Sequence, residues 1–232
     1  MRRMRGIEIL HEDEDLLVVE KAAGVLSQST RRGDDYCVAS ALTDYVRKGQ
    51  ARSRRQVYLV HRLDRETSGV MVVAKTPEAE DYFRSRWNEI TEKTYLALVE
   101  GRMADDAGAF ESYLSEDPRT LRVRSVPNPA HGKLARTEWR VLERRKGTSL
   151  VEAKLHTGRK NQIRVHFAEA GHPVVGDRKY GGKGAGLCLH AWRLAFVHPR
   201  TRVRVEFESA PPRWAQAQHV ANQEILQQGE KR

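Results

Sequence analysis

VHRLDRETSG, residues 60–69, places one aspartate, Asp64, between two arginines, and apolar runs flank the stretch on both sides. The runs at 57–60 and 70–74 are rich in β-branched and apolar residues, a composition that predicts two buried strands. A charged segment between two buried strands is held at the edge of a sheet. We therefore expect Asp64 to have a fixed position in the fold.

Asp64 has the chemistry of a catalytic residue and also that of an ordinary structural one. An ionised carboxylate serves as a covalent nucleophile or a general base, and Arg62 or Arg65 beside it would keep it charged and oriented. The alternative is a solvated turn or a structural ion pair, which is the more common role of an aspartate beside arginines. Charge alone favours that alternative.

The string HRLDR at 61–65, followed by TSG at 67–69, resembles the signature of the RluA family of pseudouridine synthases. In that family the aspartate of this motif is catalytic, and the resemblance carries this role to Asp64. The similarity extends from about Ile7 to about Phe207 and so covers nearly the whole chain. On these grounds we interpret Asp64 as a catalytic residue.

Two further stretches strengthen the resemblance. EKTYLALVEG, residues 92–101, predicts an alternating strand in which Tyr95 shares a face with Ala97 and Val99. It resembles a family motif whose tyrosine lies against the target base, which implies that role for Tyr95. TGRKNQIRVH, residues 157–166, resembles a motif whose arginine pairs with the catalytic aspartate, which implies that role for Arg164. Arg164 also lies beside the apolar stripe of a predicted helix, where a partly buried arginine requires an anionic partner.

The chain departs from the family pattern at two positions. Ala22 stands where the family usually has proline between Lys21 and Gly24, and Asn161 stands where it commonly has histidine. Asn161 is only a neighbour of Arg164 in sequence, so the assignment of Arg164 is unchanged. Four basic residues close to the motifs are candidate RNA-binding residues: Lys21, Arg62, Arg65 and Arg159. Lys21 would reach a phosphate or simply be exposed.

The composition favours a polyanionic partner. The 232 residues include 41 Lys and Arg against 31 Asp and Glu, a formal net charge of +10, and this balance fits nucleic acid better than an acidic metabolite or a membrane surface. No run of about 18 apolar residues or signal peptide is visible, so we expect a soluble, cytoplasmic protein. The two cysteines, Cys37 and Cys188, form no CxxC pair and predict neither a disulfide framework nor a thiolate metal site.

The order of the predicted elements favours one α+β domain over residues 1–232, with its core at about 7–208. Strand-like segments outnumber helical ones without alternating with them, which predicts a mixed, mainly antiparallel sheet with flanking helices. The helices are expected after an Asp34 or Asp35 cap, after Thr76, and from a Thr157 cap to Gly171. A last helix is expected to begin at Pro211, with residues 211–232 forming a C-terminal helix and tail. The stretch 103–129 contains a predicted strand at 109–114 and is otherwise the least interpretable part of the chain.

The expected function is that of an RNA pseudouridine synthase acting on ribosomal RNA, transfer RNA or both. The resemblance implies a monomeric, stand-alone catalytic domain without the N-terminal RNA-binding module of many relatives, and a reaction that needs neither cofactor nor metal. The enzyme should extrude the uridine from its stack. Whether Asp64 adds to the sugar, adds to the base or removes a sugar proton stays open.

Two other functions remain as alternatives. The first is a catalytically inactive RNA-binding protein of the same fold, against which the intact trio Asp64, Tyr95 and Arg164 argues. The second is a metal-dependent phosphodiesterase that uses some of the nine histidines together with Asp64, although no metal-ligand spacing stands out in the sequence.

Overall fold

Twelve strands pair into one sheet in the computed structural model, which describes residues 3–29, 36–50 and 52–216. The main order is β1-β2-β3-β5-β11-β6-β10-β9-β7-β8, with β4 pairing to β5 and β12 to β11. Every pairing among these strands is antiparallel except that of β5 with β11. The predicted mixed, mainly antiparallel sheet is confirmed.

The elements follow one another along the chain without a regular alternation of strand and helix. The strands are β1 Arg3–Met4, β2 Ile7–Glu12, β3 Leu16–Lys21, β4 Tyr58–Leu59, β5 Ser68–Ala74, β6 Thr91–Glu100, β7 Ala107–Glu116, β8 Val123–Val126, β9 Lys133–Arg145, β10 Thr148–Leu155, β11 Leu189–Val197 and β12 Arg204–Glu208. The helices are α1 Val38–Arg47, α2 Pro77–Ile90 and α3 Gln162–Glu169, with single 3₁₀ turns η1 Pro129–His131 and η2 Arg213–Ala215.

The parallel pair lies at the end of the charged stretch. Ser68 and Gly69, the last residues of that stretch, pair with His190 and Ala191 at the start of β11. Gly69 has φ +117°, and a Cβ added there would lie 2.1 Å from the carbonyl oxygen of Ala191. Only glycine allows this approach. The glycine of the motif therefore joins the loop that carries Asp64 to the centre of the sheet.

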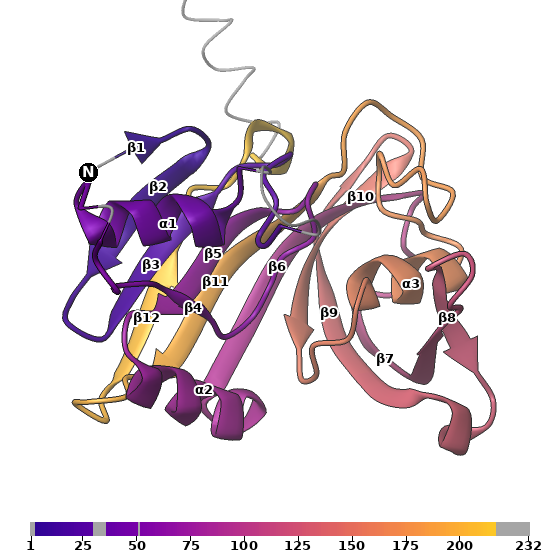
Figure 1. The fold of residues 1–232 in the computed structure, drawn as a ribbon. Helices are drawn as coiled ribbons and strands as arrows, with labels where there is room; N and C mark the ends of the chain where they lie inside the picture. The colour runs from indigo at the N-terminus through magenta and orange to yellow at the C-terminus, as the bar shows by residue number, and fades with distance from the viewer. Residues whose placement is uncertain (1–2, 30–35, 51, 217–232) are drawn as a thin grey trace, which may run out of the picture.

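Successive side chains of a strand point to opposite faces of the sheet, and helices cover both faces. On β3 and β5, Leu17, Val19, Met71 and Val73 pack against α1. Their neighbours, at 16, 18, 70 and 72, point to the opposite face and pack against Phe83 of α2. Helix α3 packs on the far half of the sheet, over β6, β9 and β10 (Figure 1).

Tyr95 of β6 lies where two of these cores meet. Its ring packs against the core beneath α1 and also against the core beneath α3. Ala97 and Val99 belong to the α3 core, so the predicted shared face of the three residues is confirmed.

Two helix starts differ from the prediction. Helix α1 is capped by Cys37, whose Sγ accepts from the Ser40 backbone N–H while the Ser40 side chain accepts from the Cys37 N–H. The predicted caps Asp34 and Asp35 lie outside the described residues. Helix α3 begins after Asn161 and not after Thr157, because the Thr157 hydroxyl instead accepts from the Arg136 N–H at 2.9 Å and donates to the Gln162 side chain at 2.7 Å. The predicted Thr76 cap of α2 is confirmed by its bond from the Ala79 N–H.

The end of the chain and the stretch 103–129 also differ from what the sequence indicates. Only the 3₁₀ turn η2 follows Pro212 in the described part, and the rest of the predicted C-terminal helix lies at 217–232, outside it. The strand expected at 109–114 is present as the longer β7, and β8, which we did not predict, pairs with it.

None of the described helices is long and apolar enough to cross a membrane.

Candidate active site

The loop that carries Asp64 is pinned on both sides of that residue. Ser27 makes two bonds to Leu63: its hydroxyl donates to the Leu63 carbonyl at 2.7 Å and accepts from the Leu63 N–H at 3.1 Å. On the other side, the Arg65 carbonyl accepts from the Gly24 N–H at 2.8 Å. Both neighbours of Asp64 are thereby fixed to the segment that follows β3. The rigid position predicted from the flanking strands has this physical basis.

Lys21 belongs to the same anchoring and is not a phosphate contact. The side chain is fully buried, and its ammonium donates to the carbonyls of Ala22, Val25 and Arg65 at 2.8 to 3.0 Å. Burial lowers the pKa of this ammonium to about 8, against the attraction of Glu66 and Asp64. All three N–H groups of an ammonium are used, so the expected RNA-binding role of Lys21 is wrong.

Arg164 pairs with Asp64 and with a second acid at the same time. Its Nη1 lies 2.9 Å from Asp64 Oδ2, so the predicted ion pair is confirmed. Its Nε and Nη2 lie 2.6 and 2.7 Å from the two oxygens of Asp177, a buried carboxylate. Burial works against the guanidinium charge, but the bonds and charges of Asp177 and Asp64 outweigh it and raise the pKa of Arg164. The bidentate contact fixes the plane of the guanidinium, and Arg164 thereby fixes Asp64.

Asn161 is the second partner of Asp64. Its Nδ2 donates to Asp64 Oδ2 at 2.6 Å, and its Oδ1 accepts from Lys179 Nζ and from the Tyr180 hydroxyl at 3.3 and 3.1 Å. Because an ammonium only donates, Lys179 fixes which end of the amide faces Asp64. The position at which this chain departs from the family pattern thus touches the candidate catalytic residue itself, and sequence reasoning missed this contact.

One oxygen of Asp64 is left open. Oδ2 accepts from both Arg164 and Asn161, whereas Oδ1 accepts no hydrogen bond from any residue that the structure describes. The side chain is 32 % exposed and lines a narrow pocket of about 70 Å³ that is open to solvent. The carboxylate is therefore held firmly at one oxygen and is accessible at the other.

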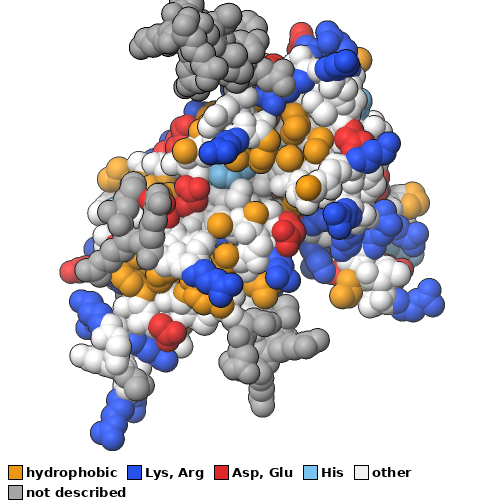
Figure 2. Space-filling model, turned by 90° about the horizontal axis from the view of Figure 1, so that it is seen from above, with side chains coloured by type: hydrophobic (Ala, Val, Ile, Leu, Met, Phe, Trp, Pro, Cys, Tyr) orange, Lys and Arg blue, Asp and Glu red, His pale blue; other side chains and the backbone are white. Residues whose placement is uncertain are grey.

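The pocket brings together most of the residues that the sequence singled out. Asp64, Arg164 and Tyr95 line it, as do Arg62 and Arg159. Arg65 does not line it: its side chain is exposed and its Nε donates to the Gly24 carbonyl at 3.1 Å. Seen from above, Lys and Arg side chains gather on the side of the molecule formed by β7, β8 and α3 (Figure 2).

Tyr95 contributes a ring to this pocket. Burial, assisted by the negative charge of Asp64, raises the pKa of the phenol well above its ordinary value. Tyr95 is consequently protonated at neutral pH and cannot serve as a phenolate base.

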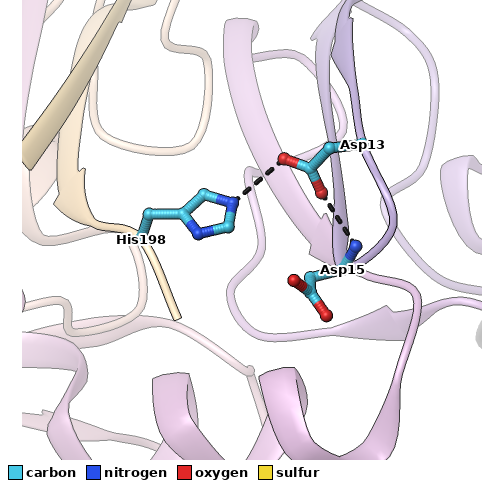
Figure 3. Close-up of side chains that lie close together, drawn as sticks. All are labelled: Asp13, Asp15 and His198. Carbon is cyan, nitrogen blue, oxygen red and sulfur yellow. Dashed lines mark hydrogen bonds and ion pairs between the residues drawn. The ribbon is translucent and has the colours of Figure 1, made fainter. Parts of the chain in front are cut away.

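The residues that line the pocket do not form a metal site. They include one carboxylate, Asp64, and no histidine, so they lack the donor set that a metal-dependent phosphodiesterase needs. Within the described residues, a cluster with metal-ligand geometry occurs elsewhere, at Asp13, Asp15 and His198 (Figure 3).

The donor atoms of that cluster are already engaged. Asp13 Oδ2 contacts Nε2 of His198 and of His11 at 3.0 and 2.9 Å, while its Oδ1 accepts from the backbone of Asp15 and Leu16. Both oxygens of Asp15 accept from Arg200, at 2.5 and 2.8 Å. The cluster is an ion-pair network that ties the β2–β3 turn to the β11–β12 turn.

Comparison with known proteins identifies the class of enzyme. Residues 15–169 match the model of the RNA pseudouridylate synthase family. A protein of Aquifex aeolicus (strain VF5), named an uncharacterized RNA pseudouridine synthase, is 37% identical over 222 residues, which cover 89% of this chain and 70% of that protein. A ribosomal large subunit pseudouridine synthase D of Nitrosomonas europaea is 34% identical over 89% of this chain and 62% of its own length.

Solved structures agree with these relatives. The human RNA pseudouridylate synthase domain containing 4 superimposes with a TM-score of 0.71 at 25% identity, covering 89% of each chain. The human RNA pseudouridylate synthase domain containing 1 superimposes with a TM-score of 0.70 at 26% identity, covering 91% of this chain and 87% of that one. The chain belongs to the RNA pseudouridylate synthase family and is an RNA pseudouridine synthase, an isomerase; this assignment does not support the inactive RNA-binding protein considered as an alternative.

Proposed function

We propose that this enzyme converts specific uridines of ribosomal RNA, transfer RNA or both to pseudouridine, with Asp64 as the catalytic carboxylate. The observation that carries the proposal is the half-engaged state of Asp64, which lines the pocket: Arg164 and Asn161 hold its Oδ2, while no described residue donates a hydrogen bond to its Oδ1. Adding to the sugar, adding to the base and removing a sugar proton all require an ionised oxygen facing the substrate. The geometry supports each of these routes.

The surrounding residues have complementary roles in the proposed reaction. The N1–C1′ bond of uridine breaks and a C5–C1′ bond forms, while C5 gives up its proton and N1 takes one up, so the atoms balance without any redox partner. Arg164 keeps Asp64 ionised and oriented, and the ring of Tyr95 lies against the extruded base. Arg62 and Arg159 on the pocket wall contact the RNA backbone.

A map of pseudouridines in cellular RNA tests the proposal. Ribosomal and transfer RNA from cells with and without this protein should differ at one or a few positions, and purified protein should restore those positions in the unmodified RNA. The name of the Nitrosomonas europaea relative makes large-subunit ribosomal RNA the first substrate to examine. If the two maps were identical and the purified protein modified neither RNA, the proposed activity would be rejected.

A further inference from the structure

A second and larger hollow adjoins the catalytic pocket. It lies between β7, β8, the η1 turn, the start of β9 and the loop 158–160, and its volume is about 480 Å³, against about 70 Å³ for the catalytic pocket. Arg159 lines both hollows, so they are neighbours. We call the second hollow the rim groove; its lining residues that matter here are Leu114, Val123, His131, Lys133 and Arg159.

The rim groove combines an apolar floor with polar and aromatic groups above it. Leu114 and Val123 are buried at its base, whereas His131 and Lys133 are exposed at its edge. An exposed imidazole ring is a surface on which a nucleobase can stack, and an unpaired ammonium attracts a phosphate. The catalytic pocket, at about 70 Å³, is much smaller than the rim groove, so the nucleotides that flank the target have to lie outside it.

His131 and Lys133 are held in place by their turn. The Asn128 side chain caps η1 by accepting from the Ala130 N–H at 2.9 Å. Gly132 lies so close to β7 that an added Cβ would be 2.9 Å from Cβ of Tyr113 and 2.7 Å from Val126 Cγ2. The imidazole and the ammonium are therefore presented from a rigid backbone, which lowers the entropy cost of binding a ligand.

Acids neutralise only part of the charge around the rim groove: Lys160 pairs with Glu116, and both residues line the groove. Elsewhere many arginines pair with glutamates, as in Arg140–Glu152, Arg193–Glu208 and Arg204–Glu92. By contrast, three basic residues near the groove form no ion pair with any described residue. They are Lys133, Arg119 in the β7–β8 connection and Arg124 in β8. Figure 2 shows Lys and Arg gathered on this side of the molecule. The net positive charge is thus concentrated where an RNA strand leaving the catalytic pocket would pass.

We propose that the rim groove binds an unstacked nucleotide next to the target uridine in the substrate RNA, with its base on His131 and its phosphate between Lys133 and Arg159. The inference rests on the proposed RNA-modifying function. It adds a specificity-determining site, because a nucleotide that must unstack to enter the groove selects loops and single strands over continuous helices.

Two single substitutions and one matched control test the proposal. Lys133→Glu and His131→Ala alter the rim groove, and Lys146→Glu makes the same charge change at an exposed lysine in the β9–β10 turn. The probe is large-subunit ribosomal RNA transcribed in vitro. Lys133→Glu should weaken RNA binding about tenfold and reduce the slope of log affinity against log salt by roughly one. His131→Ala should weaken binding at least about fivefold, and Lys146→Glu should stay within about twofold of the parent.

Cross-linking supplies a readout that needs no turnover. RNA containing 4-thiouridine beside the modified position should cross-link to the segment 129–133 in the parent. Equal RNA affinity of Lys133→Glu, His131→Ala and Lys146→Glu, or cross-links confined to other segments, would overturn the rim groove assignment while leaving the enzymatic function intact. A parent that binds this RNA through the groove but forms no pseudouridine in any RNA would instead refute the proposed function alone.

Discussion

Among the described residues, the Asp13 cluster and the Asp64 pocket both gather acidic and basic side chains, but they differ in how their carboxylates are engaged. At the β2–β3 turn, both oxygens of Asp13 and both of Asp15 are occupied by histidines, Arg200 or backbone N–H groups. Figure 3 shows the bonds of Asp13 to His198 and to the Asp15 N–H. At the pocket, the described residues anchor Asp64 at Oδ2 only, through Arg164 and Asn161. The difference shows that a dense charge cluster is not by itself a site. A carboxylate becomes available for catalysis when its anchoring leaves one oxygen facing a cavity.

The largest expected effect separates these two carboxylates directly. Asp64→Asn should lower the rate of pseudouridine formation by about 10⁴-fold, because an amide is neither a nucleophile nor a base. The matched change Asp13→Asn should leave the rate within about threefold, since Asp13 contacts no pocket residue. Rates are measured on one RNA, with circular dichroism to check folding. A turnover by Asp64→Asn close to the parental rate would refute the catalytic assignment.

The two arginines at the centre of these clusters should differ in their effect on stability. Arg164 is 13 % exposed and the side chain of its partner Asp177 is fully buried, so Arg164→Met leaves a buried carboxylate with backbone N–H donors but no charged partner and should lower the free energy of unfolding by about 3–5 kcal/mol. Arg200 is 58 % exposed, and water can replace it, so Arg200→Met should cost distinctly less. Urea denaturation compares the two. Equal losses would contradict the difference in burial on which the comparison rests.

Substitutions of Asn161 test whether its hydrogen bond to Asp64 matters for turnover. Removing its bond to Asp64 Oδ2 in Asn161→Ala should lower kcat by about 10- to 100-fold, the range expected for a hydrogen bond to a charged group, with little change in KM. Asn161→His, which restores a donor, should recover part of the loss. A change in KM with unaltered kcat would mean that Asn161 binds RNA and does not position Asp64.

Tyr95 lines the pocket with an aromatic side chain, which we propose stacks on the target base. If the ring stacks on the base, Tyr95→Leu should weaken RNA binding by roughly 1–3 kcal/mol, while Tyr95→Phe should stay close to the parent. Affinities are measured at matched salt concentration. Equal affinities of the two variants would exclude a stacking role.

The smallest expected effect concerns acid stability of the closed cluster. Burial raises the pKa of Asp13, but bonds from His11, His198 and two backbone N–H groups outweigh it and lower the pKa to about 2 from the ordinary 3.8. A depressed folded-state pKa stabilises the fold above the unfolded value, and this contribution is lost as pH falls from about 4 to about 2. The parent should lose unfolding free energy as pH falls through that window, and Asp13→Asn should reduce this loss by about 1 kcal/mol after allowance for solvent screening. An unchanged pH profile would contradict this assignment.

Much of the fold was readable because it depends on local patterns. β-Branched runs gave β3 and β5, Thr76 and Pro77 gave the start of α2, and the alternation of 95–99 gave the shared face of Tyr95, Ala97 and Val99. The cap of α1 was not readable, because a cysteine is a rare cap and Cys37 acts only together with the Ser40 side chain. Thr157 does not cap α3 because its hydroxyl accepts from the N–H of Arg136, a residue 21 positions away in the chain.

The sequence by itself determined the family and the sheet class and named three candidate site residues, Asp64, Tyr95 and Arg164, because the resemblance rests on short contiguous strings. Only the tertiary structure decided which groups complete the site. Asp177 and Asn161 reach Arg164 and Asp64 from separate turns, and Asp64 and Asn161 are 97 positions apart in the chain. Lys21 reads as a surface lysine and is buried among carbonyls. Hydrogen bonds and burial depend on which backbone segments the fold brings together, and no local pattern contains that information.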